Sequence, residues 1–350
     1  MRTIAQRLDN ERIARAKRGF TTRRAELTDV VTLLHQEDPP RAGDLVLARV
    51  DQLGQHTWLE GPSGRRQNMF VGDELIIAYG NRYAPDYFEA FVPEHTGPCH
   101  LVAAGGVAGE VSNGRNGLKP PTALTPMGLL ADGEGRVLNL ARWMVPLREA
   151  SRRTPTLAVL GTAMNSGKTT TAAWLVRGLA RSGQRVGAAK VTGTGAGKDL
   201  WLMADAGATP VLDFTDAGYP STYRLSSEVV DRVLLTLTAA LEEAGCDAIV
   251  LEIADGIYQP ETAALLASSV FRDRVDGVVF AASDAAGAAA GVAALEQAGV
   301  VVVGVSGRLT SAPLAVREAR LATGLPVLGL QALADPANLD MLSIGRPVAA

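Results

Sequence analysis

A glycine-bounded segment near the middle of the chain has the residue types of a phosphate-binding loop. It reads Gly161-Thr-Ala-Met-Asn-Ser-Gly-Lys168-Thr169-Thr170. In such a loop the backbone N–H groups and the N-terminus of the next helix face phosphate oxygens, and the lysine brings positive charge to the β- and γ-phosphates. The hydroxyl of Thr169 is placed to bind Mg²⁺. We therefore predict that a nucleotide is bound by Thr162, Asn165, Ser166, Gly167, Lys168, Thr169 and Thr170.

The first glycine of this segment stands one residue earlier than in the common pattern. Gly-x-x-x-x-Gly-Lys requires glycine at position 162, where this chain has Thr162. The flanking sequence fits nonetheless, because residues 156–160 have the pattern of a buried strand and residues 168–181 that of an amphipathic helix. A strand, a loop and a helix in this order are the context that a phosphate-binding loop requires.

Two acidic residues follow another apolar run. Glu252 closes residues 248–252, a predicted strand, at the carboxyl edge where open α/β sheets bind ligands. A carboxylate there can hold Mg²⁺ directly or through water, so Thr169 and Glu252 are the predicted metal ligands. Asp255 could share that work or orient an attacking group. Helix capping or turn formation would also explain both acidic residues.

The elements that must position these residues alternate along the second half of the chain. Strand patterns occur at 156–160, 185–189, 248–252, 277–281, 300–305 and 326–330, with helical patterns at 168–181, 226–244, 261–269, 286–298 and 312–323. Repeated strand–helix spacing predicts an α/β domain with a parallel sheet flanked by helices. We assign it to residues 151–350.

The first 150 residues have a different pattern. Short strands separated by glycine turns predict a small β-rich, barrel-like domain at 41–150. Residues 1–40 are rich in arginine and show helical spacing, as at Leu8, Ile13 and Ala16. This predicts a basic helical arm that packs on its own protein, although such an arm could also meet a phosphate-rich partner. The loop at 80–89 mixes polar and aromatic residues, and its Arg82 is a predicted substrate contact, although domain packing would explain the loop equally well.

Composition excludes several classes of protein. A formal charge of -3 leaves no overall basic footprint for nucleic acid or an anionic membrane. The sequence shows no secretion signal and no apolar run long enough to span a bilayer, so we expect a cytoplasmic protein. The 2 cysteines and 4 histidines are scattered, which argues against a zinc site. Apolar helices and sheet edges would permit a homodimer.

The shifted glycine carries a family resemblance. Gly-Thr-x-x-x-x-Gly-Lys-Thr resembles dethiobiotin synthetase and its relatives, in the class of P-loop NTPases that includes MinD. The MinD branch carries an extra lysine where this chain has Thr162. The resemblance covers roughly residues 156–334 and is nearest to the DgcN-like family, which is linked to N-acetylation of D-glutamate. That family carries a Glu-Gly-Gln-Gly-like turn where this chain reads Glu252-Ile-Ala-Asp-Gly256.

The resemblance implies roles for residues that follow the second strand. A lysine at this place in dethiobiotin synthetase-like enzymes meets the transferred phosphoryl group or the substrate, which makes Lys190 a catalytic candidate. Thr192 and Thr194 then become substrate-binding candidates. The predicted catalytic set is Lys168, Lys190, Glu252 and Asp255.

Three functions remain open on these residues. The first is an enzyme that uses Mg-ATP to phosphorylate or otherwise activate a small carboxylate or amine. The second is a nucleotide-switched accessory protein for cofactor assembly. The third is an N-acyltransferase that reuses the loop for the phosphates of coenzyme A. The Lys168-Thr169 pair favours the first, and the absence of an Asn-Lys-x-Asp sequence favours ATP over GTP.

Overall fold

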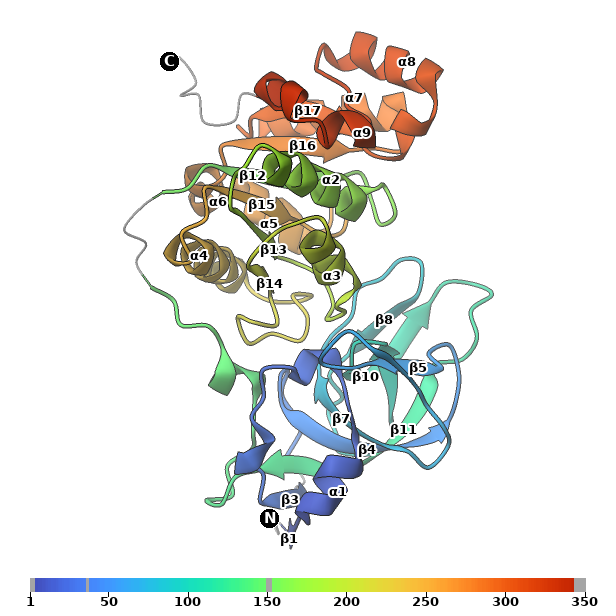
Figure 1. The fold of residues 1–350 in the computed structure, drawn as a ribbon. Coiled ribbons are helices and arrows are strands. Elements are labelled where there is room, and N and C mark those ends of the chain that lie inside the picture. Colours follow the sequence, from blue (N-terminus) through green and yellow to red (C-terminus); the bar gives the residue numbers. More distant parts are fainter. Residues whose placement is uncertain (1–3, 36–37, 149–152, 343–350) are drawn as a thin grey trace. The chain divides into compact units, whose positions relative to one another are not determined.

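The computed structural model describes residues 4–35, 38–148 and 153–342 (Figure 1). Its contacts divide the chain into two compact units. Unit 1 comprises Met1–Val145 together with Thr194–Lys198 and Phe214–Arg224. Unit 2 comprises Pro146–Gly193, Asp199–Asp213 and Leu225–Ala350. The two short segments of unit 1 are therefore drawn from the second half of the sequence.

Unit 2 is built on a six-stranded sheet in which every pairing is parallel. The strand order is β14-β13-β15-β12-β16-β17. The strands are β12 (Thr156–Gly161), β13 (Val186–Lys190), β14 (Val211–Asp213), β15 (Ala248–Glu252), β16 (Gly277–Ala281) and β17 (Val302–Ser306). The helices that follow them are α2 (Lys168–Arg181), α3 (Lys198–Asp205), α4 (Ser227–Glu243), α5 (Pro260–Ala267), α6 (Ser269–Arg274), α7 (Ala285–Gln297), α8 (Pro313–Thr323) and α9 (Leu330–Leu333).

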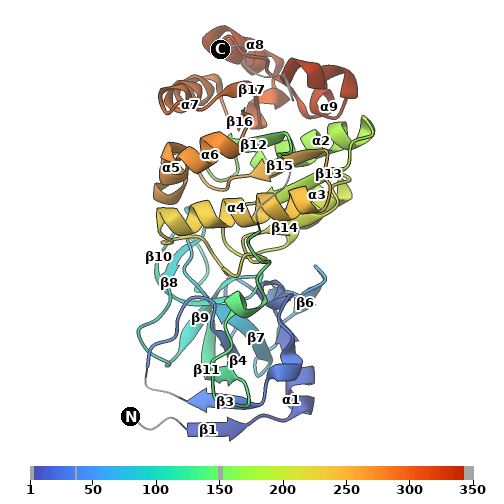
Figure 2. The same cartoon turned by 90° about the vertical axis from the view of Figure 1, so that its left-hand side faces the viewer.

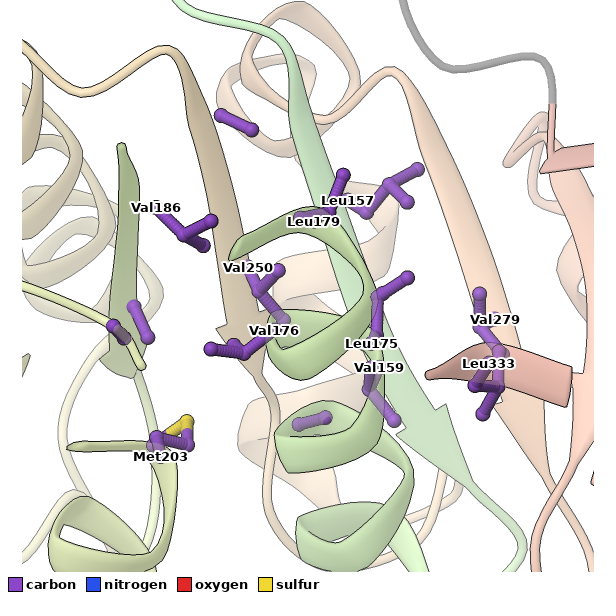
Figure 3. Close-up of a cluster of buried hydrophobic side chains, with 14 of the residues drawn as sticks. Leu157, Val159, Leu175, Val176, Leu179, Val186, Met203, Val250, Val279 and Leu333 are labelled. Atoms are coloured by element: carbon purple, nitrogen blue, oxygen red, sulfur yellow. The ribbon is translucent and has the colours of Figure 1, made fainter. Parts of the chain in front are cut away.

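Helices cover both faces of this sheet, with α2 on one face and α5 on the other (Figure 2). Parallel strands buried on both faces read as continuous apolar runs, and β12, β15 and β16 are buried along their whole length. The apolar stripe of α2 packs Leu175, Val176 and Leu179 against side chains of these strands (Figure 3). The predicted α/β fold with a parallel sheet flanked by helices is confirmed.

Two details of unit 2 differ from the sequence prediction. Residues 326–330 do not form a full strand: Val327 makes a single parallel bridge to Val305, and Leu330 already begins α9. The sequence also did not predict β14 and α3, which are 3 and 8 residues long. Elements this short carry too few apolar positions to establish a period, and contacts with neighbouring elements decide their conformation.

Unit 1 is β-rich. Its 9-stranded sheet includes a closed ring of pairings, β11–β4–β7–β10–β9–β11, and β1–β3 and β8 extend it. The elements are β1 (Ile4–Arg7), α1 (Asn10–Arg15), β2 (Lys17–Arg18), β3 (Thr32–His35), β4 (Leu45–Gln52), β5 (Trp58–Glu60), β6 (Arg66–Asn68), β7 (Glu74–Tyr79), β8 (Phe88–Phe91), β9 (Cys99–Ala103), β10 (Val107–Gly114) and β11 (Thr122–Ala131).

The predicted helical arm at 1–40 is wrong for the residues that the structure describes. Only α1 is an α-helix there, and β1 and β3 pair with each other as part of the sheet. The apolar residues Leu8, Ile13 and Ala16, whose spacing suggested a helical stripe, enter a core of unit 1. They do so from different elements and from the segments between them rather than from one helix face. Some basic residues of this segment pair with acidic residues of their own unit, Arg12 with Glu74 and Lys17 with Asp73.

Among the described residues, no helix combines the length and the apolar character needed to cross a membrane.

We predict that the α2 core dominates the stability of unit 2. Leu175 is fully buried, so Leu175→Ala should cost about 2–5 kcal/mol through lost apolar contact and a cavity. Leu321 in α8 is 83% exposed, and Leu321→Ala should change stability by less than about 0.5 kcal/mol. Urea unfolding followed by circular dichroism measures both. Equal losses in the two variants would contradict this assignment of the core.

Candidate functional site

The glycine-bounded loop lies between the end of β12 and the start of α2. Gly167, with φ 102°, occupies the position before α2, and Asn165 also has a positive φ of 64°. No side chain caps α2, so the first N–H groups of this 14-residue helix have no capping side chain as acceptor. Such a helix N-terminus is a ready anion site.

Backbone contacts hold the loop in this shape. The N–H of Thr162 donates to Ala281 O at 3.0 Å, and the N–H of Arg308 donates to Ser166 O at 3.0 Å. A Cβ at Gly161 would lie 2.3 Å from Ser166 Oγ, so only glycine fits where the loop leaves the strand. The glycine at 161, rather than at 162, is therefore required by the fold of this loop.

Lys168 is buried in the loop. Its Nζ donates to the carbonyl of Ala163 at 2.8 Å, which folds the side chain over the loop's own backbone. Burial lowers the pKa of Lys168, while the Glu252 and Asp255 carboxylates oppose that shift. The lysine charge is thus held inside the loop, next to acidic groups on the neighbouring strand end.

Thr169 and Glu252 are in direct contact. The Thr169 hydroxyl donates to Glu252 Oε1 at 2.8 Å, and the Glu252 side chain is only 2% exposed. Its second oxygen, Oε2, is buried and has no hydrogen-bond partner among the described residues. Burial raises the pKa of Glu252, and Lys190 opposes the shift. An acceptor oxygen left without a donor is the kind of group that a cation or its water satisfies.

The register of three neighbouring strands explains why charges meet here. Lys190 on β13 lies opposite Glu252 on β15, and on its other side opposite Asp213 on β14. All three residues end their strands, so their side chains share the carboxyl edge of the sheet. The Lys190 Nζ lies 3.9 Å from Glu252 Oε1 and makes a closer ion pair with Asp199.

Asp199 is the site residue that the predicted sets left out. It lies in the first turn of α3, and its carboxylate pairs with Lys190. Burial alone would lower the pKa of Lys190, but Asp199 and Glu252 raise it above its usual range. The sequence signal for Asp199 was weak, because one carboxylate after a glycine-rich stretch does not mark a helix start.

The turn after β15 touches both the loop and the end of β13. The N–H of Ala254 donates to Thr192 Oγ1 at 2.9 Å, so Thr192 positions this turn. A Cβ at Gly256 would lie 2.5 Å from Thr162 O, which places the turn directly against the start of the phosphate loop. Asp255 between them has a φ of 63°.

Two predicted substrate contacts belong to unit 1. Thr194 makes a bridge to Ser221 within that unit. Arg82 is 8% exposed, stacks over the ring of Tyr87, and places Nη1 3.1 Å from His56 Nε2. A nearby cavity of about 300 Å³ is lined by Tyr87 but not by Arg82. A substrate role for Arg82 or Thr194 stays a prediction.

The eleven predicted residues that remain belong to unit 2. They are Thr162, Asn165, Ser166, Gly167, Lys168, Thr169 and Thr170 in the loop and first turn of α2, Lys190 and Glu252 at adjacent strand ends, and Thr192 and Asp255 just beyond those ends. Within the described part of the chain, no three or more His, Cys, Asp or Glu side chains form a group that could hold a metal ion. A metal here would therefore rely on Glu252, the Thr169 hydroxyl and ligands from outside the chain.

The strand order and the loop geometry together define the fold. Unit 2 is a P-loop NTPase fold. No protein-family model and no curated protein sequence matches the chain. The resemblance to the dethiobiotin synthetase class and the DgcN-like family therefore stays a prediction.

Solved structures give distant matches. The chain is 16% identical to the signal recognition particle 54 kDa protein of Aeropyrum pernix in complex with GDP, over 56% of this chain and 47% of that one, with a TM-score of 0.38. The kinase domain of the Escherichia coli tyrosine kinase ETK matches at 16% identity over 44% of this chain and 67% of that one, with a TM-score of 0.33. A DUF1611 family protein of Anabaena variabilis matches at 14% identity over 57% of this chain and 60% of that one, with a TM-score of 0.40.

The match covers 47% of the signal recognition particle protein, which is less than half of its length. With identities of 14–16% and TM-scores of 0.33–0.40, the likenesses carry no argument about activity. Function must be argued from the site itself.

We predict that the turn containing Gly256 and the start of the phosphate loop at Thr162 pack too tightly to admit a further methyl group. Gly256→Ala should cost about 1–3 kcal/mol, because the new methyl group meets the backbone oxygen of Thr162 rather than a flexible side chain. Gly329→Ala is the matched control, since its Cβ would meet nothing nearer than 3.9 Å and its φ is −72°. Thermal unfolding of both variants checks this, and an equal Tm for the two would show that the turns do not press on each other.

Proposed function

We propose that unit 2 binds a nucleoside triphosphate with Mg²⁺ and uses its γ-phosphoryl group to activate a small carboxylate or amine metabolite. The observation that carries this proposal is the bond from the Thr169 hydroxyl to the buried Glu252, directly beside Lys168 and Lys190. A phosphate loop alone would bind many anions. A hydroxyl, a carboxylate and two lysines at one sheet edge suit a triphosphate that is bound with a metal and transferred.

The loop supplies the phosphate-binding groups. The uncapped N-terminus of α2 presents backbone N–H donors, and the positive end of the helix dipole favours an anion there. Lys168 would exchange its bond to the Ala163 carbonyl for phosphate oxygens. This exchange is favourable, because a charge-assisted bond to an anion is stronger than one to a neutral carbonyl.

The residues present fit a magnesium ion. Thr169 offers a hydroxyl oxygen, and Glu252 Oε2 is a buried acceptor without a partner in the described chain. These two groups would hold Mg²⁺, which would supply positive charge against the negative charge of the phosphates. Glu252 would hold it directly or through water, and Thr169 would keep its present position at the start of α2.

Lys190 is the second cation of the site. In the structure its ammonium group pairs with Asp199 and lies near Glu252, so its charge is balanced by carboxylates. To stabilise charge on a transferred phosphoryl group, Lys190 would turn from Asp199 towards the anion. Asp199 thus keeps the lysine charged and in place when no phosphate is present.

A nucleotide-switched binding protein is the second candidate, and one observation favours it. Residues 194–198 begin four positions after Lys190, yet they belong to unit 1. There the N–H of Gly197 donates to Glu60 Oε2 at 2.8 Å, and the N–H of Gly195 donates to Pro220 O at 2.9 Å. A change at Lys190 would reach unit 1 along this short stretch of chain.

Lys168 is the residue on which the proposed phosphate site depends. We predict that Lys168→Ala lowers phosphate release from Mg-ATP by at least about 100-fold, because a preorganised charge at the phosphates is lost. Lys119→Ala, at an exposed lysine of unit 1, should leave the rate unchanged. A malachite-green assay measures both, with circular dichroism to verify folding. Unchanged turnover in Lys168→Ala would defeat the proposal.

The choice of nucleotide separates the candidate functions. Isothermal titration with ATP, GTP and acetyl-coenzyme A, each with and without Mg²⁺, should show binding of ATP that is strengthened by the metal. ATP is expected because the sequence lacks an Asn-Lys-x-Asp segment for reading guanine. Tight binding of acetyl-coenzyme A without nucleotide binding would favour the acyltransferase that the DgcN-like resemblance implies.

A further inference from the structure

The turn that carries Asp255 is fixed from three directions. The Ala254 N–H donates to Thr192 Oγ1 at 2.9 Å, and the Ala254 carbonyl accepts from the Thr262 hydroxyl at 3.3 Å. On the third side Gly256 lies against Thr162 of the phosphate loop. The position of Asp255 relative to the loop is therefore set by the backbone of unit 2.

Asp255 adopts a conformation that is unusual for its residue type. Its φ of 63° lies in the left-handed region, which is costly for side chains other than glycine and least so for Asp and Asn. Its carboxylate makes no hydrogen bond or ion pair within the described part of the chain. The carboxylate thus makes no capping or turn hydrogen bond within the described residues, and strained residues of this kind gather at functional sites.

The charged groups that face Asp255 come from three elements. Lys168 at the start of α2 and Lys190 at the end of β13 attract its charge, while Glu261 on α5 repels it. Burial is the main cause that raises the pKa of Asp255, and the two lysines oppose it. Asp255 is therefore a half-buried carboxylate that shares the two cations assigned above to the phosphate groups.

We propose that Asp255 accepts the proton of the nucleophile that attacks the γ-phosphate, so that the acceptor substrate is an amine or a hydroxyl compound. This rests on the proposed function and revises its substrate class: the carboxylate is excluded, the amine is kept and a hydroxyl compound is added. A carboxylate acceptor has no proton to lose on attack and would need no such group. A second free carboxylate beside the phosphates would moreover repel a carboxylate substrate.

The step balances with the groups named. A lone pair of the amine nitrogen or hydroxyl oxygen forms the bond to phosphorus, and the bond from phosphorus to the β-phosphate oxygen breaks. That electron pair leaves with the nucleoside diphosphate. The proton of the nucleophile passes to an Asp255 carboxylate oxygen and from there to solvent. Water can take the place of the acceptor, which gives slow hydrolysis.

Asp255→Asn tests the charge alone, because asparagine has the same size and tolerates the same φ. Phosphate release from Mg-ATP, with water as the acceptor, should fall by about 100-fold or more, as expected for loss of a general base. The nucleotide Kd should change less than about threefold. Asp273→Asn, at an exposed aspartate of α6, is the matched control and should change neither quantity.

The pH dependence of the rate distinguishes a general base from a residue that only supports the fold, because a purely structural residue would not change the pH profile. A base works when ionised, so the wild-type rate should rise with pH through the raised pKa of Asp255, and Asp255→Asn should lose this rise. In the folded chain a raised carboxyl pKa means that ionisation lowers stability as pH rises. Asp255→Asn should therefore raise the Tm at pH about 7.5 and have no such effect at pH about 3, below the ordinary aspartate pKa.

The outcomes separate the two proposals. If Asp255→Asn kept the wild-type rate and pH profile, the role of Asp255 would be overturned and the proposed function would stand. Nucleotide binding by the wild-type chain without any phosphate release would also overturn that role. Failure of the wild-type chain to bind ATP or GTP would defeat the proposed function first.

Discussion

The pairing of charges at the carboxyl edge of the unit 2 sheet is the constraint on which the site depends. The register places Lys190 opposite Glu252, and their side chains are 12% and 2% exposed. A buried charge is tolerated only when it is paired, so removing Lys190 would leave the carboxylates of Glu252 and Asp199 without the cation that they share. The Glu252 carboxylate also receives the Thr169 hydroxyl and so ties the start of α2 to β15. The phosphate loop is thereby anchored at its helical end by a side chain from the neighbouring strand.

This arrangement also leaves two carboxylates of the site without a full set of hydrogen-bond partners in the described chain. Glu252 keeps a buried oxygen without a partner in the described chain, and Asp255 keeps a strained backbone and a carboxylate without a hydrogen bond. Both groups lower the stability of the folded state, since burial raises the pKa of each. Unsatisfied groups of this kind are rare in protein interiors. Their concentration beside an uncapped helix N-terminus is what distinguishes this edge from an ordinary ion-pair network.

Sequence reasoning worked where a local pattern has one physical interpretation. Continuous apolar runs such as 248–252 predicted buried parallel strands, and the glycine-bounded loop before 168–181 predicted a strand–loop–helix unit. It failed at 4–35, where the spacing of Leu8, Ile13 and Ala16 mimics a helical period. Their burial comes from contacts with strands far along the chain, which include residues 45–47 and 76–78. Sequence alone does not distinguish a true helical period from this scattered burial, because the strands that bury these residues lie far along the chain.

The sequence by itself determined the phosphate loop, its lysine and its threonine, because these residues act within ten consecutive positions. It also determined that Glu252 ends a buried strand. Only the tertiary structure decided that Glu252 reaches Thr169, that Asp199 pairs with Lys190, and that Thr192 holds the Asp255 turn. It also assigned Arg82 and Thr194 to unit 1. The reason is physical: strand register and helix starts set these contacts, and both depend on packing between segments distant in sequence.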